Sequence, residues 1–311
     1  MRRWIGRIGL FLLGLAITVL VMAEIEVRCS GLGDRPLYRA DSSIGYIPRP
    51  SQNGRFHNRH DWAFNAHSMR TDQPFRPDPA ARDVLLIGDS VIFGGHDNAS
   101  TPGPALARAS GTRVWPVAAP SWGLANALTY LEENDDVVRA VDDIVFVVNS
   151  ADFGPASHWI NGFMHPTKRP LSYAAYWLGS QFLMGWRGNE IPVIDRGTLG
   201  LRLDRLQRTT RARVLFVYYP TRDEVISGED CFAVPEAIRR FPGYCLGRDP
   251  EWSLAIYKDL VHPRPEASPL LGRAMARALV AAAGQKPADA AKVAGPSATD
   301  LSQNSTDSTD N

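Results

Sequence analysis

The sequence predicts an α/β protein in which helices cover both faces of a mostly parallel sheet, preceded by one N-terminal transmembrane helix. Three observations carry this prediction. Short, continuously apolar strands alternate with helical segments, which is the pattern of parallel strands buried on both faces. An almost uncharged stretch, 8–23, follows Arg2, Arg3 and Arg7. Polar residues follow several of the predicted strands, at the sheet edge where such proteins bind their ligands.

The first 27 residues are expected to form an N-terminal membrane anchor or signal segment. Positive charge before an apolar stretch keeps the N-terminus in the cytoplasm and sends the following chain across the membrane. A spanning helix needs about 20 apolar residues, a length reached when residues 4–6 are counted and Arg7 snorkels. The alternative is a secretory signal that is cut after Ala23. The apolar pattern continues at Ile25 and Val27, which favours the anchor. In either case the rest of the chain lies on the exported side, periplasmic or extracellular.

Four apolar runs are expected to be strands, and four further segments are expected to be helices. Pro116 is expected to break the second strand, because proline cannot donate to a β-ladder. In the helix at 199–211, leucines are expected to face the core and arginines the solvent. The strands lie at 84–87, 114–118, 144–148 and 213–219, and the helices at 105–109, 124–131, 199–211 and 268–283; the apolar face of 199–211 has Leu199, Leu201, Leu203 and Leu206, and its exposed face has Arg202, Arg205 and Arg208.

The exported part is expected to be one large domain with additions. Residues 28–80 form an N-terminal extension that packs on the main domain, 81–283. The main domain carries an insertion at 155–198 whose stretch 159–186 is rich in aromatic residues. This stretch is interpreted as a helical subdomain or a bilayer contact, with a lid or a sugar-stacking surface as alternatives. The tail, 284–311, has too little apolar content to fold and is expected to be disordered.

Composition excludes several classes of partner. The chain has 34 basic and 33 acidic residues with no basic block, so no nucleic-acid partner is expected. Its seven histidines show no metal-ligand spacing, so neither a metal nor another cofactor is expected. Cys231 and Cys245 are close enough in sequence to form a disulfide in an oxidising compartment, although two unpaired thiols remain the alternative. No role is assigned to Cys29.

Three residues are candidates for nucleophilic catalysis. Ser90 follows an apolar strand in Gly88-Asp89-Ser90, and Asp259 and His262 lie three residues apart near the C-terminus. A serine becomes a good nucleophile when a base takes its proton. Histidine serves as that base near neutral pH, and an aspartate orients the imidazole and stabilises its charged form. The alternative for each residue is structural, with Ser90 and Asp259 as helix caps and His262 at the surface.

The order Ser–Asp–His also occurs in α/β-hydrolases, but their Gly-x-Ser-x-Gly elbow lacks its second glycine here. The residues instead resemble the SGNH or GDSL hydrolases. Gly88-Asp89-Ser90 matches the first block of that family, Ala119-Pro120-Ser121-Trp122-Gly123 is similar to the second, and Asp259-Leu260-Val261-His262-Pro263 matches the last. The stretches 41–46 and 65–70 also resemble membrane-anchored bacterial-type members. The resemblance covers about 84–283 and implies a flavodoxin-like three-layer α/β/α sandwich and ester hydrolysis.

The same resemblance implies an oxyanion hole. Its expected donors are the backbone N–H groups of Ser90 and Gly123 and a side chain from the third block, usually Gly-x-Asn-Asp. The aligned residues here are Asn149-Ser150-Ala151-Asp152, so Ala151 occupies the donor position. Asn149 is expected to be the best available side-chain donor, with Ser150 as the alternative. Losing one such donor elsewhere costs about 2.7–4 kcal/mol in the barrier.

The sequence therefore predicts a membrane-anchored serine esterase. Its expected substrates are O-acyl, in particular acetyl, esters of a small molecule or a carbohydrate, such as an envelope or exported polysaccharide. The expected route is an acyl-serine intermediate on Ser90. Two alternatives remain open: an O-acyltransferase that uses the same triad, and a catalytically weak glycan-binding or assembly protein.

Overall fold

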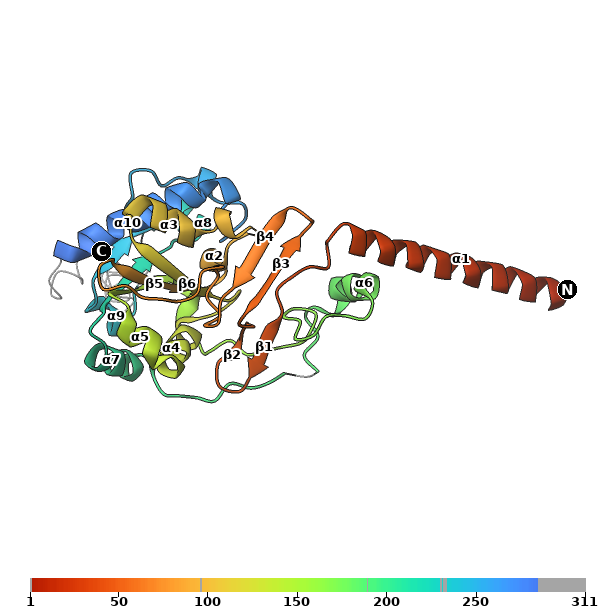
Figure 1. Cartoon of the computed structure of the whole chain (residues 1–311), viewed down its shortest axis with the longest axis horizontal. Helices are drawn as coiled ribbons and strands as arrows, with labels where there is room; N and C mark the ends of the chain where they lie inside the picture. The colour runs from red at the N-terminus through yellow and green to blue at the C-terminus, as the bar shows by residue number, and fades with distance from the viewer. Residues whose placement is uncertain (1, 96, 189, 230, 232–233, 285–311) are drawn as a thin grey trace, which may run out of the picture.

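A five-stranded parallel sheet forms the centre of the molecule in the computed structural model (Figure 1), which describes residues 2–284 except 96, 189, 230, 232 and 233. The strands follow the order β6-β5-β7-β8-β9, and every neighbouring pair is parallel. In chain order this is the doubly wound arrangement 2-1-3-4-5, whose winding reverses between β5 and β7. The predicted fold class is therefore confirmed. The strands are β5 (Asp83–Gly88), β6 (Arg113–Ala118), β7 (Asp143–Val148), β8 (Arg213–Tyr218) and β9 (Gly243–Cys245).

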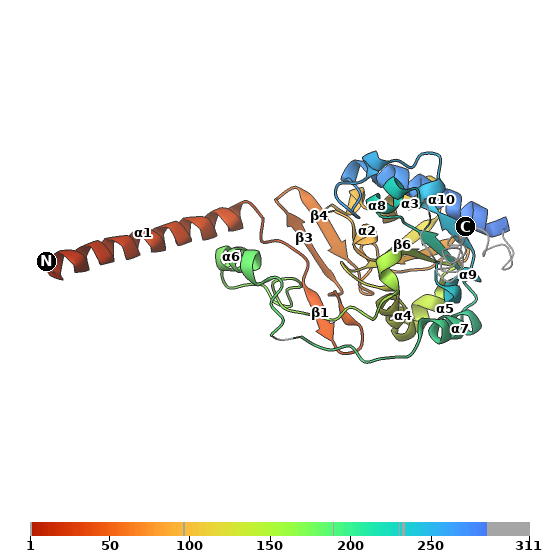
Figure 2. The same ribbon diagram turned by 180° about the vertical axis from the view of Figure 1, so that it is seen from behind.

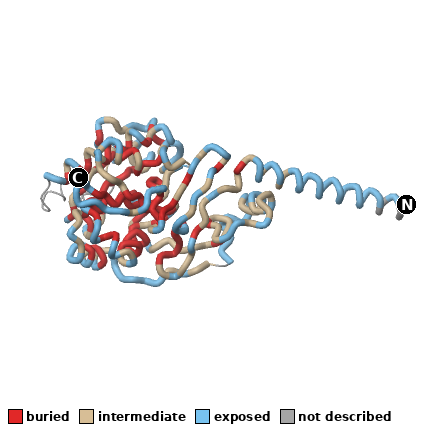
Figure 3. Tube along the Cα trace, in the orientation of Figure 1, coloured by how far each residue is buried: buried red, intermediate tan, exposed pale blue. Residues whose placement is uncertain are grey.

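Helices cover both faces of this sheet (Figure 1), and each face has its own apolar core. The buried residues gather in this part of the molecule, whereas α1 is exposed (Figure 3). Successive side chains of a strand point to opposite faces. Accordingly, Leu85 and Ile87 of β5 pack in one core, while Val84 and Leu86 pack in the other. The first core is closed by α4 (Leu124–Glu133), α5 (Asp135–Ala140), α7 (Leu199–Thr209) and α9 (Glu236–Arg239), and the second by α2 (Ser90–Phe93), α3 (Pro102–Ser110), α8 (Arg222–Ser227) and α10 (Ser268–Gly284).

Pro116 does not break β6, contrary to the prediction. The strand runs continuously from Arg113 to Ala118 and pairs with β5 alone, because it is the edge of the sheet. An edge strand needs no N–H donor on its outer side, so it tolerates proline. Moreover, the carbonyl of Pro116 accepts a hydrogen bond from the backbone N–H of Arg70 at 2.7 Å. The N-terminal extension is thereby attached to this edge.

In α7, the prediction that Leu201 faces the core and Arg202 faces the solvent was wrong. Leu201 is 67% exposed, whereas Arg202 is only 5% exposed. The guanidinium of Arg202 donates to both carboxylate oxygens of Glu132, at 2.8 and 3.0 Å, and to the hydroxyl of Thr129. An α-helix turns once in 3.6 residues, so Arg202 shares a face with Leu203 and Leu206 that Leu201 does not reach. Paired in this way, the arginine is part of the packed face of the helix.

The N-terminal part consists of one long helix and two hairpins. α1 (Arg2–Cys29) contains a span, Arg7–Cys29, that is long and apolar enough to cross a membrane. The first hairpin joins β1 (Tyr38–Asp41) to β2 (Gly45–Pro48), and the second joins β3 (Gln52–Phe56) to β4 (His60–Phe64). Tyr46 of β2 is buried in the same core as Trp122. The extension therefore packs directly on the parallel-sheet domain.

The stretch 155–198 has little regular structure. Its helix, α6 (Tyr173–Leu183), lies beside the end of α1, and an isolated bridge joins Trp159 to Ile191. Further along the chain, a disulfide joins Cys231 to Cys245, which agrees with the proposed pairing; Cys29 is free and exposed. The predicted disordered tail lies outside the described residues, except for Gly284, which ends α10.

Candidate active site

Ser90 is the first residue of α2, directly after β5. Asp89 caps this short helix, because its carboxylate accepts a hydrogen bond from the N–H of Val91 at 2.8 Å. Gly88 permits the tight turn: a Cβ on it would lie 2.7 Å from the side chain of Ile92 and 3.0 Å from a carbonyl of β7. The serine thus sits at the carboxyl edge of the sheet, next to the point where the winding reverses.

Asp259 and His262 lie on one turn of the chain near the C-terminus. A carboxylate oxygen of Asp259 accepts hydrogen bonds from the N–H groups of Val261, at 3.0 Å, and His262, at 2.8 Å. Both carboxylate oxygens also lie 3.0 Å from Nδ1 of the His262 ring. An ionised carboxylate only accepts, so this contact puts the imidazole proton on Nδ1 and leaves Nε2 free to act as a base.

The structure brings the two segments together at Ser90. Nε2 of His262 lies 3.0 Å from Oγ of Ser90. The side chains of His262 and Asp259 are 48% and 50% exposed, so the triad lies at an open surface. Partial burial tends to raise the pKa of Asp259, but hydrogen bonds from the backbone of His262 and Val261 and from the His262 ring outweigh it and lower that pKa. Asp259 is therefore ionised where it orients the histidine.

A buried polar cluster lies behind the nucleophile and consists of Asp89, Asn149 and Asp152. The amide of Asn149 donates to Asp89 at 3.2 Å, and its backbone N–H donates to Asp152 at 2.8 Å. The side-chain oxygen of Asn149 accepts from the N–H of Ala151 at 2.9 Å. Burial raises the pKa of both carboxyl groups, and the charge of Asp89 raises that of Asp152 further. Both carboxyl groups therefore keep a proton to higher pH than an exposed aspartate does.

Hydrogen bonds also fix the positions of Gly123 and Asn149, the other two predicted oxyanion residues. The N–H of Gly123 donates to the side chain of Asn126 at 3.1 Å, and a Cβ on Gly123 would lie 2.9 Å from the carbonyl of Asp152. The glycine therefore allows close approach between the second and third blocks, while Asn149 is bonded to Asp89. The donor roles of Ser90, Gly123 and Asn149 stay predictions.

Two buried side chains that position the site escaped the sequence analysis. Asn126 donates to the carbonyls of Ile44 and Ser157 and accepts from the N–H of Ser157, besides that of Gly123. It joins the extension, the insertion and the second block. A polar residue inside the predicted helix 124–131 was the available signal, because a buried asparagine must find partners.

Arg70 is the second of these side chains. Its guanidinium donates to the carbonyls of Phe93 and Gly95, at the end of α2, and to Asn98. It also lies over the ring of Phe93, with 4.6 Å to the centroid. Burial lowers the pKa of Arg70 to about 10. The residue holds the helix that carries Ser90, and only its place in the resembling stretch 65–70 pointed to it.

No protein-family model and no curated protein matches the chain. Solved structures do match it. A G-D-S-L family lipolytic protein of Desulfitobacterium hafniense is 13% identical, with 63% of this chain and 98% of that chain covered and a TM-score of 0.35. A carbohydrate esterase family 2 enzyme of Myceliophthora fergusii is 17% identical, covering 68% and 69%, with a TM-score of 0.35.

Two further solved structures are also similar to the chain. An acetyl xylan esterase of Butyrivibrio proteoclasticus is 11% identical over 68% of this chain and 66% of that chain, with a TM-score of 0.35. A salicylyl-acyltransferase of a tetracycline biosynthetic pathway is 14% identical over 68% and 57%, with a TM-score of 0.30. The chain is similar to these solved hydrolase, esterase and acyltransferase structures at 11–17% identity.

Proposed function

We propose that the protein is a serine esterase that acts through an acyl intermediate on Ser90. The observation that supports this proposal is the continuous contact from Asp259 through His262 to Ser90, at 3.0 Å for each step. A serine that only caps a helix needs no histidine at its hydroxyl, and a surface histidine needs no carboxylate at Nδ1. Nucleophile, base and orienting group within hydrogen-bond reach are the arrangement that acyl transfer requires.

The reaction proceeds in two halves. Nε2 of His262 takes the proton of Ser90 as Oγ attacks the ester carbonyl, and the charge moves to the carbonyl oxygen. When the tetrahedral intermediate collapses, the ester C–O bond breaks and the imidazolium returns the proton to the leaving alcohol. Water then attacks the acyl-serine with His262 as base. The bond between Oγ and the acyl carbon breaks, Ser90 takes the proton back from His262, and the carboxylic acid leaves. The proposed oxyanion donors are the N–H groups of Ser90 and Gly123 and the amide of Asn149. In this role Gly123 gives up its bond to Asn126, while Asn149 uses the amide hydrogen that does not bond Asp89.

The proposed substrates are O-acetyl or other O-acyl esters on an exported carbohydrate. The half-exposed triad supports a substrate whose acyl group projects from a larger body, because an open site admits a polymer. The apolar span of α1 supports a membrane-attached protein with its active site on the exported side. An acylated small molecule fits the same chemistry and is the second substrate class to assay.

Labelling with a fluorophosphonate tests the proposal without a known substrate. The reagent is expected to modify wild type at Ser90 and to leave Ser90→Ala unmodified. Ser227→Ala, which removes an exposed serine at the end of α8, is the matched control and should label like wild type. A labelled peptide that contains a serine other than Ser90, or no labelling of folded protein, contradicts the proposal and favours the glycan-binding or assembly alternative.

Hydrolysis and transfer differ only in the group that attacks the acyl-serine. Incubation with an acetyl donor and an oligosaccharide acceptor distinguishes them. The esterase proposal expects acetate as the main product at every acceptor concentration. Acetylated acceptor in excess of acetate, lost in Ser90→Ala, identifies an O-acyltransferase instead.

A further inference from the structure

α6 exposes a large apolar surface next to α1. Its outer face contains Ala175, Leu178 and Phe182, which are spaced for one side of a helix, and Phe182 is 79% exposed. Trp177 adds an exposed indole beside them. Further exposed apolar residues lie at the two ends of the helix. Leu171 precedes it, Leu183 is its last residue, and Met184 and Trp186 follow it. Contiguous apolar surface of this kind marks a contact with a membrane or another molecule.

This surface is rigidly placed, because both ends of α6 are capped from other parts of the chain. At the N-terminal end, the carboxylate of Glu24 in α1 accepts from the N–H groups of Tyr173 and Ala174 and from the hydroxyl of Ser172. At the C-terminal end, the buried amide of Asn161 donates to the carbonyls of Leu183, Met184 and Trp186. The exposed face therefore belongs to an ordered element.

The hydrogen bonds to Glu24 fix the point along α1 at which α6 begins. Glu24 is the first charged residue after the uncharged stretch of α1. At a rise of about 1.5 Å per residue, residues 4–23 cover roughly 30 Å, the thickness of the hydrocarbon core, provided that Arg7 snorkels to the cytoplasmic headgroups. Glu24, and with it the start of α6, then lies at the boundary between acyl chains and headgroups.

The orientation of α6 also suits this boundary. In Figures 1 and 2, α1 runs across the view while the ribbon of α6 is seen nearly end-on beside the C-terminal part of α1. The two axes therefore cross steeply. If α1 spans the bilayer along its normal, α6 lies along the plane of the membrane surface. We propose that α6 and the turn after it lie in the exported-side leaflet as a second, interfacial membrane contact.

The charges around the segment favour a bilayer over a second copy of the chain. Residues 170–186 carry no charge, whereas exposed cations flank them. Lys168 and Arg169 precede the segment and Arg187 follows it, with Arg169 also paired to Asp34 and Arg187 to Glu190. Trp177 and Trp186 are of the type enriched at membrane interfaces, and flanking cations pair with lipid phosphates. The surface is also continuous with α1, the helix whose apolar span is long enough to cross a membrane.

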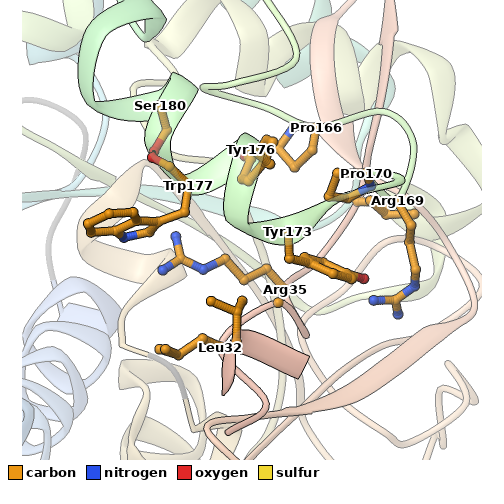
Figure 4. Close-up of a pocket in the computed structure, with 12 residues that line it drawn as sticks. Leu32, Arg35, Pro166, Arg169, Pro170, Tyr173, Tyr176, Trp177 and Ser180 are labelled. Carbon is orange, nitrogen blue, oxygen red and sulfur yellow. The ribbon is translucent and has the colours of Figure 1, made fainter. Parts of the chain in front are cut away.

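The opposite side of α6 shows how the helix is supported. A pocket between α6 and the segment after α1 is lined by Leu32, Arg35, Tyr173 and Tyr176, with Trp177 at its edge (Figure 4). Tyr176 stacks on Phe163 at 5.8 Å and donates its hydroxyl to the carbonyl of that residue. The tyrosines thus face the protein, which leaves the face with Leu178 and Phe182 for the lipid.

Spin labelling of the full chain in vesicles tests this placement. Cys29→Ser removes the free thiol and leaves the Cys231–Cys245 disulfide intact. Phe182→Cys then carries the nitroxide, and Ile226→Cys in α8, where Ile226 is 59% exposed, is the matched control. Vesicles of phosphatidylcholine and phosphatidylglycerol hold the protein. Collisions with oxygen report lipid, and collisions with a water-soluble nickel chelate report solvent.

The expected result is a several-fold higher ratio of oxygen to nickel collisions at position 182 than at 226. Equal ratios at both positions would place α6 in water and overturn the proposal. A nitroxide at 182 that is shielded from both reagents would indicate burial against a second copy, which also overturns it. Neither readout depends on ester hydrolysis, so the proposed function and this placement are tested separately.

Tryptophan fluorescence gives a second measurement that needs no label. The emission lost in Trp177→Phe is the Trp177 signal, and bilayers of acyl-chain-brominated phosphatidylcholine are expected to quench most of it. Trp252→Phe, which removes a half-buried tryptophan that packs edge-on against Tyr219 and Tyr257, is the control whose difference signal stays unquenched. Full Trp177 emission in brominated lipid would refute the bilayer contact.

Discussion

Nε2 of His262 lies 3.0 Å from Oγ of Ser90, although 172 residues separate the two in the chain. Each side chain arrives by a different route. Ser90 is placed by the end of β5 and the cap of α2, and His262 by a turn that Asp259 closes with two backbone hydrogen bonds. Because both supports are local, the contact depends on how the parallel sheet brings the two segments to one edge.

Asp259→Asn is expected to lower turnover of p-nitrophenyl acetate by about 10²- to 10⁴-fold, because the amide N–H₂ favours the wrong imidazole tautomer. Steady-state rates at neutral pH check this, with Ser90→Ala as the baseline. Glu266→Gln, an exposed acidic residue nearby in sequence, should stay at the wild-type rate. A rate for Asp259→Asn within a few-fold of wild type would exclude an orienting role.

Asp152→Asn is expected to flatten the pH dependence of stability. Burial raises the pKa of Asp152, so the folded state keeps a proton that the unfolded state loses above about pH 4. The neutral, protonated Asp152 favours the folded state fully below the pKa that the group has in the unfolded chain. This contribution is lost as the pH rises through the higher pKa that the group has in the folded protein. Wild type therefore loses stability with rising pH relative to the variant, by at most about 1.4 kcal/mol per pH unit.

Thermal unfolding from pH 4 to 8 measures this difference. Asp89→Asn should also flatten the pH dependence, because burial raises the pKa of Asp89 as well. The exposed Asp135, replaced by asparagine, should keep the wild-type slope. Parallel pH profiles for wild type and both buried-site variants would show that neither carboxyl binds the extra proton.

Asp143→Ala is expected to destabilise the fold by about 1–3 kcal/mol, because it removes the buried acceptor shared by two arginines that keep part of their contact with water. The side chain of Asp143 is 0% exposed and pairs with Arg82, at 2.5 Å, and Arg213, at 2.8 Å. Denaturant unfolding gives the value. The exposed pair of Asp135 with Arg139 is the control, and Asp135→Ala should cost less than about 1 kcal/mol. Equal costs would contradict a structural role for the buried pair.

Asn126→Ala is expected to reduce both stability and turnover. It leaves the half-buried N–H groups of Gly123 and Ser157 and the buried carbonyl of Ile44 without their partner. Unsatisfied buried groups cost about 1–3 kcal/mol each. Asn134→Ala, which removes a single bond to the carbonyl of Tyr130, is the milder control. A destabilised Asn126→Ala variant that keeps wild-type turnover would show that Asn126 stabilises the fold without positioning the second block for catalysis.

Predictions from the sequence succeeded where a short stretch of chain carries its own information. The apolar runs at 84–87 and 144–148 became β5 and β7, because continuous β-branched and aromatic residues suit buried parallel strands. Gly88-Asp89-Ser90 became a strand-to-helix turn for an equally local reason, the cap that Asp89 supplies. The fold class and the placement of Ser90 at the carboxyl edge followed from such patterns.

Predictions failed where a distant partner decides the outcome. Pro116 is tolerated because β6 turned out to be an edge strand, and strand order is a property of the whole sheet. Arg202 is buried because Glu132 and Thr129 meet its guanidinium. In both cases the local residue type indicated exposure or disruption, and a contact far along the chain reversed it.

By itself, the sequence determined the apolar α1, the α/β class and the residues able to do nucleophilic chemistry, since periodicity and side-chain type are written in short stretches of chain. Only the tertiary structure decided that His262 reaches Ser90, that Asn149 bonds Asp89, and that Glu24 caps α6. Each of these is a hydrogen bond of a few ångströms between segments 60 or more residues apart. Its formation depends on the packing of the intervening elements, which no local pattern records.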